Sequence, residues 1–127
     1  MNVITCRIED AGAEDSYNAF RDALCGGHAR RYAMLYRGGD GVRCKLENSG
    51  RCLDPDTPWK MLRFMIDPLF RFDDKTEWVA LFPVENWKQR CDAALQASLE
   101  NGRPWGHILA DTLAEEMAAL PRLVIIR

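Results

Sequence analysis

The sequence lacks the features that usually mark a secreted or membrane-spanning protein. No apolar run approaches the roughly 20 residues that a helix needs to cross a bilayer. Residues 1–7 contain no basic segment followed by a long apolar stretch, so no secretory signal is predicted. A disordered chain is excluded as well, because 47% of the residues are hydrophobic and the net charge is only -2. We therefore expect a globular cytoplasmic protein that has no membrane partner.

The cysteines do not follow the pattern of a disulfide framework. There are 5, an odd number, and their spacing is wide and irregular. Cys6, Cys44 and Cys91 fall on apolar stripes, and a free cysteine behaves as a small buried hydrophobic residue. These three are predicted to lie in the core of a reduced protein.

What the sequence does contain is a mixture of strand and helix patterns within one unit. Its 127 residues suit a single domain, and no linker or internal repeat divides them. The patterns follow the order β-α-β-β-α-β-α-α-β, which predicts an α+β domain spanning residues 1–127. We expect one mixed or antiparallel sheet with a central hairpin and with helices packed on it. The continuous apolar run at residues 123–126 predicts a strand near the middle of that sheet, covered on both faces.

Two of the predicted helices carry wide or long apolar stripes. The helix that begins at residues 57–58 is apolar over much of its circumference, at Trp59, Met61, Leu62, Phe64, Met65 and Ile66. Such a helix is buried between layers or presents a face to a partner. Pro68 is predicted to end it. The longest helix, from about residue 84 to 101, repeats apolar residues on one face at Val84, Trp87, Cys91, Leu95 and Leu99.

Residues 28–51 carry a local excess of positive charge. Strand patterns at residues 32–36 and 42–46 flank a glycine-rich turn, so this segment is predicted to form a β-hairpin. Strict alternation in its second strand puts Arg43 and Lys45 on the outer face. We predict that the hairpin docks on an acidic partner, through Arg30, Arg31, Tyr36, Arg37, Arg43, Lys45 and Arg51. Electrostatic complementarity would fix the alignment of the two proteins and speed their association, and the tyrosines would supply the apolar surface that the interface buries.

Nucleic acid is an alternative partner for the same hairpin. Basic side chains can follow a phosphate backbone while Tyr32 and Tyr36 stack on bases. The isoelectric point of the chain is acidic, however, whereas most nucleic-acid-binding domains are basic. The sequence therefore favours a protein partner.

A second alternative places chemistry on Cys25 and His28, which are separated by two residues. Cys25 would lie at the end of a helix, where the helix dipole disfavours the thiolate that a cysteine nucleophile needs. As zinc ligands the two residues would need a second pair, but seven residues separate Cys44 from Cys52, whereas two to four usually separate the members of such a pair. A cysteine-dependent enzyme or a small zinc protein is thus a weaker interpretation.

These patterns predict a non-enzymatic protein-binding domain that needs no cofactor or metal. Small cytosolic inhibitors, immunity proteins, phage counter-defence proteins and accessory subunits share this profile of a compact, mildly acidic chain with few motifs. That interpretation rests on the basic hairpin being available to a partner.

Overall fold

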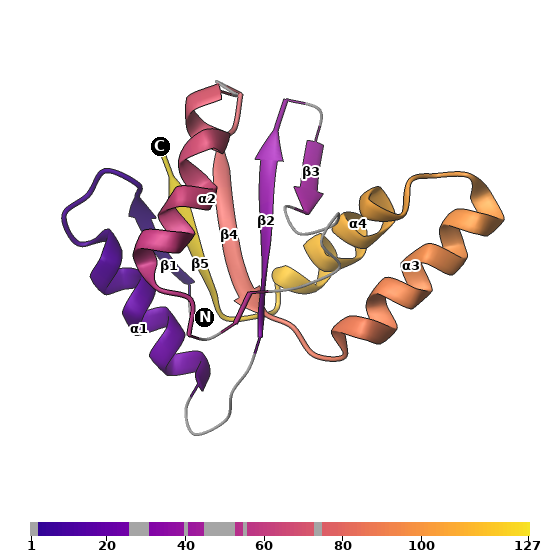
Figure 1. Cartoon of the computed structure of the whole chain (residues 1–127), viewed down its shortest axis with the longest axis horizontal. Helices are drawn as coiled ribbons and strands as arrows, with labels where there is room; N and C mark the ends of the chain where they lie inside the picture. Colours follow the sequence, from indigo (N-terminus) through magenta and orange to yellow (C-terminus); the bar gives the residue numbers. More distant parts are fainter. Residues whose placement is uncertain (1–2, 26–30, 40, 45–52, 55, 73–74) are drawn as a thin grey trace.

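A computed structural model of the chain describes residues 3–25, 31–39, 41–44, 53–54, 56–72 and 75–127. Within these residues the helices and strands follow the predicted order, which confirms the α+β class (Figure 1). The elements are β1 (Val3–Arg7), α1 (Ala13–Cys25), β2 (Tyr32–Gly38), β3 (Gly41–Cys44), α2 (Trp59–Phe72), β4 (Trp78–Pro83), α3 (Trp87–Asn101), α4 (Trp105–Met117) and β5 (Arg122–Ile126).

The five strands form one mixed sheet in the order β1-β5-β4-β2-β3. β1 runs parallel to β5, and the other neighbouring pairs are antiparallel. The predicted hairpin is β2–β3, in which Tyr36 lies opposite Arg43. The hairpin is central in the order of elements along the chain, as predicted, and it lies at one end of the strand order in the sheet.

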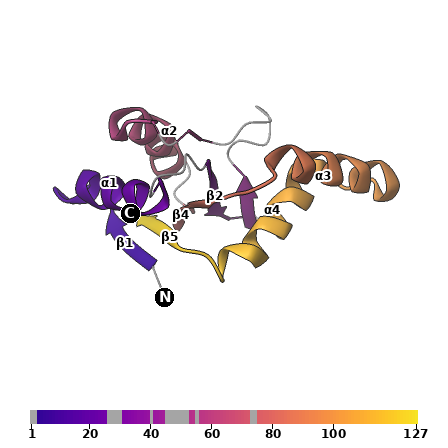
Figure 2. The same ribbon diagram turned by 90° about the horizontal axis from the view of Figure 1, so that it is seen from below.

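The helices occupy two sides of the sheet. Figure 2 shows α1 and α2 together on one side, with α4 beyond β3 toward the other side and α3 farther out. The ring of Tyr32 in β2 contacts Tyr17 and Phe20 of α1, so Tyr32 points toward the side that carries α1 and α2. Side chains alternate along a strand, and therefore Tyr36 points to that side as well.

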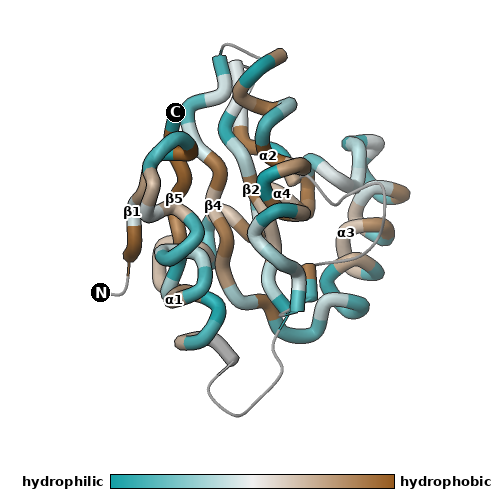
Figure 3. The backbone as a smooth tube through the Cα atoms, turned by 60° about the vertical axis from the view of Figure 1, so that its left-hand side comes forward, coloured by the Kyte–Doolittle hydropathy of each residue, from teal (hydrophilic) through white to brown (hydrophobic). Residues whose placement is uncertain are grey.

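The core lies in the central strands and in the helix faces that cover them. The hydropathy colouring of Figure 3 shows apolar residues concentrated along β4 and β5. Five of the six residues of β4 are buried, and the sixth, Trp78, is half-buried. β5 lies between β1 and β4, as its apolar run predicted, but only Leu123 and Ile125 are buried, while Val124 and Ile126 on its other face are half-buried.

α2 continues through Pro68, so the prediction that this proline ends the helix is wrong. Proline lacks the N–H that would bond to the Phe64 carbonyl, which normally costs helix stability. Phe64 and Pro68 both lie on the exposed side of α2, where water can satisfy that carbonyl. Phe70, on the opposite side and beyond the proline, is buried, and its packing stabilises the last turn.

A buried hydrogen-bond network fixes the start of α2 to α1 and β2. The Tyr17 hydroxyl donates to the Thr57 carbonyl at 2.5 Å and also forms a hydrogen bond with the Tyr32 hydroxyl. Burial, followed by the bond to Tyr17, raises the pKa of Tyr32 above its usual range. Tyr32 is thus neutral, and the two hydroxyl groups hold three segments together in the core.

Candidate protein-binding surface

α2 presents two apolar faces, of which the protein itself covers only one. The inner face consists of its buried residues Trp59, Leu62, Ile66 and Phe70. On the opposite side Met61 is 59% exposed, Phe64 82% and Phe72 80%. These three residues and the exposed Pro68 recur at spacings of three, four and four, so they share one side of the helix. We call Met61, Phe64, Pro68 and Phe72 the outer face of α2.

One flank of this outer face carries an excess of positive charge, with Asp67 lying on it between Lys60 and Arg71. Lys60 and Arg71 lie exposed on the same flank, and neither forms an ion pair with any residue that the structure describes. Arg63 is farther round the helix, where it contacts Glu9 at 3.2 Å and Asp67 at 3.5 Å. The cations nearest the exposed aromatic side chains are therefore the ones without a carboxylate partner among the described residues.

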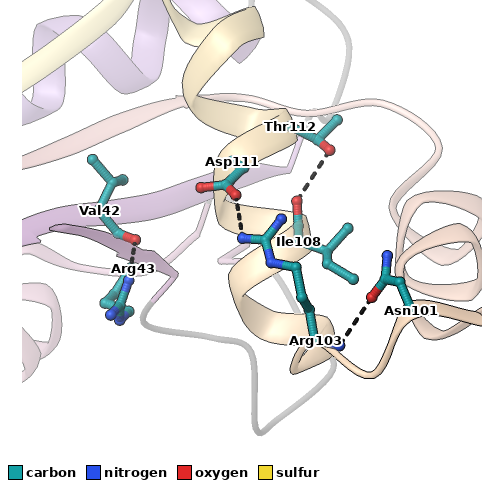
Figure 4. A network of polar contacts seen from close by, with 7 residues as sticks. All are labelled: Val42, Arg43, Asn101, Arg103, Ile108, Asp111 and Thr112. Carbon is teal, nitrogen blue, oxygen red and sulfur yellow. Dashed lines mark hydrogen bonds and ion pairs between the residues drawn. The ribbon is translucent and has the colours of Figure 1, made fainter. Parts of the chain in front are cut away.

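Two of the residues predicted from the hairpin lie on the α1 and α2 side of the sheet. Tyr36 and Arg43 are opposite each other in the β2–β3 register, so their side chains share that face. Both are half-buried. The Arg43 guanidinium donates to the Val42 carbonyl at 3.0 Å, which directs it along its own strand (Figure 4). Tyr36, like Met65 of α2, packs against the core.

The other two described residues of the predicted set lie elsewhere. Arg37 follows Tyr36 and points to the opposite face, where it contacts Glu77 at 3.2 Å. Arg31 contacts Asp54 at 3.8 Å. Ion pairs this exposed contribute at most about 1 kcal/mol to stability. Either arginine can therefore leave its carboxylate and bind an acidic residue of a partner instead. Arg30, Lys45 and Arg51 lie outside the described residues.

The residues of the thiol and zinc alternatives are only partly within the described structure. Cys25 is the last residue of α1, as predicted, and Cys44 is buried in β3. His28 and Cys52 lie outside the described residues, so their relation to Cys25 stays untested. Among the residues that the structure does describe, no group of three or more His, Cys, Asp or Glu side chains is placed to hold a metal ion.

Of the described cysteines, Cys6 shows the environment of an inert thiol. Burial, together with the nearby Asp10, raises the pKa of Cys6 above its usual value. A reactive cysteine needs the opposite shift, because the thiolate is the nucleophile. Cys6 therefore serves the core, as its place on the apolar face of β1 predicted.

A second apolar surface lies on the pair α3 and α4. A groove of about 480 Å³ lies between these helices, and Ala94, Ala97 and Leu109 are among the residues that line it. Arg90 lines it and forms a 2.5 Å ion pair with Glu116 of α4. Farther along, Arg103 contacts Asp111 at 2.7 Å and fixes the corner between the helices (Figure 4). The Leu95 and Leu99 side chains of α3 are exposed.

The outer face of α2 is the feature that sequence reasoning located only in part. The wide apolar pattern signalled either burial between layers or a face for a partner, and the structure shows one buried face and one exposed face. Phe72 was missed because the helix was expected to stop at Pro68. Its position four residues after Pro68 continues the outer spacing and was a usable signal.

Comparison with protein-family models, curated proteins and solved structures finds no match to the chain in any of the three. Among the described residues, no helix has both the length and the apolar character needed to span a bilayer.

Proposed function

We propose that this chain is a non-enzymatic protein-binding domain, of the kind represented by small inhibitors, immunity proteins, phage counter-defence proteins and accessory subunits. In this proposal the outer face of α2 forms the apolar centre of the interface. The basic hairpin β2–β3 contributes Tyr36 and Arg43 and meets acidic residues of the partner. The observation that carries the proposal is the exposure of Phe64 and Phe72 on a helix whose inner face is already buried.

The energetic basis is the cost of leaving these side chains in water. Burial of a phenylalanine or methionine side chain contributes about 1.5–3 kcal/mol. Met61, Phe64 and Phe72 thus offer a partner several kcal/mol before the costs of association are subtracted. Aromatic residues, methionine and arginine are also the types enriched at protein interfaces. Clustered apolar exposure of this kind marks binding sites more often than isolated exposed residues do.

The distribution of the hairpin charges favours a protein over a nucleic acid. A phosphate backbone requires several cations along one continuous track. Arg37 and Arg43 point to opposite faces of the hairpin, and Arg31 and Arg37 each have a carboxylate neighbour. A local contact with an acidic protein surface needs fewer aligned cations, so it fits this arrangement better.

The test of the apolar centre is a capture experiment with matched variants. The tagged chain is expressed in its native cells, and retained proteins are identified by mass spectrometry. We expect Phe64→Ser combined with Phe72→Ser to remove the specific partner. Leu95→Ser combined with Leu99→Ser, which changes two exposed leucines on α3, should retain it. Equal retention by the two double variants would show that the α2 surface is not the interface.

The test of the hairpin is charge reversal. Arg37→Glu, Arg43→Glu and Lys45→Glu together should slow association with the captured partner by roughly tenfold or more at low salt, because rim charges act mainly on the association rate. The salt dependence of that rate should fall at the same time. An unchanged rate and salt dependence would exclude the hairpin from the interface.

A further inference from the structure

The charges and geometry around the outer face of α2 indicate what kind of segment covers it. Resting on the proposed function, we infer that the occupant is an amphipathic helix of a different protein, with apolar residues along one side and acidic residues beside them. Three features lead to this inference. The site offers side chains to a partner, its exposed cations lie on one flank, and two copies of the chain would bring those cations together.

The site suits a helix because α2 offers mainly side chains: its outer backbone is hydrogen-bonded within the helix except at the Phe64 carbonyl, which Pro68 leaves without a donor. From Met61 to Phe72 the outer face covers 12 residues, or about 16 Å at a rise of 1.5 Å per residue, and three turns of a second helix cover that length. Side-chain ridges of one helix pack into the grooves of another. A partner strand needs an open sheet edge instead. At the exposed edge of β1, the Arg7 N–H bonds to the Asp10 carboxylate and the Arg7 carbonyl accepts from the Asp10 N–H, which shortens the edge available for pairing.

The partner helix should be acidic because of where the unpaired cations lie. Lys60 and Arg71 are 11 residues apart, which is close to three full turns, so both lie on one flank of the outer face. No acidic residue of the described chain forms an ion pair with either of them. Carboxylates at the two ends of a three-turn helix would meet both cations. Across an interface, charges of opposite sign fix register and exclude other partners.

A second copy of this chain fits the same site poorly. In a two-fold symmetric pair of antiparallel helices, each flank faces the identical flank of its mate. The flank with Lys60 and Arg71 would then face itself and set like charges together. A parallel pair turns that flank toward the opposite flank of α2, where the apolar Met65 and Leu69 offer no carboxylate to either cation. The occupant is therefore a different chain.

A membrane surface is a less suitable occupant, although aromatic residues beside cations also occur in helices that lie on bilayers. Attraction to anionic lipid needs a basic face, and this chain has a net charge of -2. Glu9 and Asp67 also lie next to the site, where they hold Arg63. A bilayer would bring its lipid phosphates close to these carboxylates as well as to the cations.

The test places a photoreactive side chain in the site. The full chain is expressed in its native cells with Phe64→p-benzoylphenylalanine, irradiated, and digested, and the attached peptide is sequenced by mass spectrometry. Leu99→p-benzoylphenylalanine is the matched control, because the two side chains are 82% and 83% exposed. We expect a peptide of another protein that repeats apolar residues at three- and four-residue intervals and carries flanking Asp or Glu. Adding Lys60→Glu and Arg71→Glu should lower its yield by about tenfold, while Lys88→Glu and Arg103→Glu should leave the yield unchanged.

Each other outcome overturns the inference, and the failures are distinguishable. A peptide from a second copy of this chain, a lipid adduct, or a peptide without acidic residues would refute the acidic helix while leaving residue 64 at an interface. Flotation with vesicles that contain phosphatidylserine separates the lipid case, since binding that depends on Phe64 would show a membrane site. Adduct formation at residue 64 that is no greater than at residue 99 would refute both this inference and the proposed function.

Discussion

α2 and α3 both carry apolar residues on exposed faces, but they are attached to the protein in different ways. α2 buries four large side chains against the rest of the molecule and still exposes Phe64 and Phe72. α3 buries only Ala94 and packs mainly on α4 (Figure 1). The fold therefore does not require the outer face of α2, whereas α3 is attached through the buried Ala94 and the half-buried Trp87 and Cys91. An exposed apolar face on a firmly anchored helix is the better candidate for binding, because little ordering has to be added on association.

The first way to sharpen this comparison is a pair of identical substitutions. Leu62 of α2 is completely buried, and Leu99 of α3 is 83% exposed. Leu62→Ala should lower the free energy of unfolding by about 3–5 kcal/mol, through lost burial and a residual cavity. Leu99→Ala should change it by less than about 0.5 kcal/mol. Urea unfolding followed by circular dichroism measures both values, and a similar loss in the two variants would contradict the difference in anchoring.

The second prediction concerns the polar attachments of the two helices. Tyr17→Phe keeps the ring but removes the hydroxyl bonded to Tyr32 and leaves the Thr57 carbonyl at the start of α2 with only the longer bond from Arg21 at 3.4 Å. It should cost about 1–3 kcal/mol of stability. In α3 the Ser98 hydroxyl donates to the Arg103 carbonyl at 2.5 Å in an exposed setting, so Ser98→Ala should cost at most about 0.5 kcal/mol, because water can replace the lost bond. Thermal unfolding of the two variants measures both losses of stability. A larger loss from Ser98→Ala than from Tyr17→Phe would show that the polar contacts of α3 hold more firmly than those of α2.

The third prediction concerns local opening. Cys91 lies half-buried in α3, whereas Cys6 and Cys44 are buried in the sheet. A helix that packs mainly on one neighbour opens without global unfolding. Cys91 should therefore react with iodoacetamide at least about tenfold faster than Cys6, whose raised pKa slows it further. Site-resolved mass spectrometry of the alkylated protein measures these rates, and equal protection of the two thiols would show that α3 is as firmly held as the sheet.

The fold could be predicted from sequence because its periodic patterns agree with the packing. Strict alternation in β1 and β3 and three-to-four spacing in the helices placed Cys6, Cys44 and Leu62 correctly in the core. The position of the hairpin in the sheet could not be predicted, because strand order depends on long-range pairing that leaves no local signal. Pro68 misled the prediction because packing of Phe70 outweighs the local preference of a proline.

The candidate site was harder to predict from the sequence than the fold was. The charge excess of the hairpin is visible in the sequence, but the alternation of side chains divides it between two faces of the sheet. Arg37 also contacts Glu77, which lies 40 residues farther along the chain. The wide apolar pattern of α2 did not reveal which face the sheet would cover. Only the three-dimensional arrangement separates the inner residues, such as Ile66, from the outer ones, such as Phe64.

Side-chain footprinting of the complex tests the central claim most directly. Hydroxyl radicals modify exposed methionine, phenylalanine and leucine side chains, so each surface reports its own accessibility. In the free protein Met61, Phe64 and Phe72 of α2 and Leu99 of α3 should all be modified. In the complex with the captured partner, the three α2 residues should become protected while Leu99 remains reactive. Continued modification of Phe64 and Phe72 in the complex would show that the outer face of α2 is not where this protein binds.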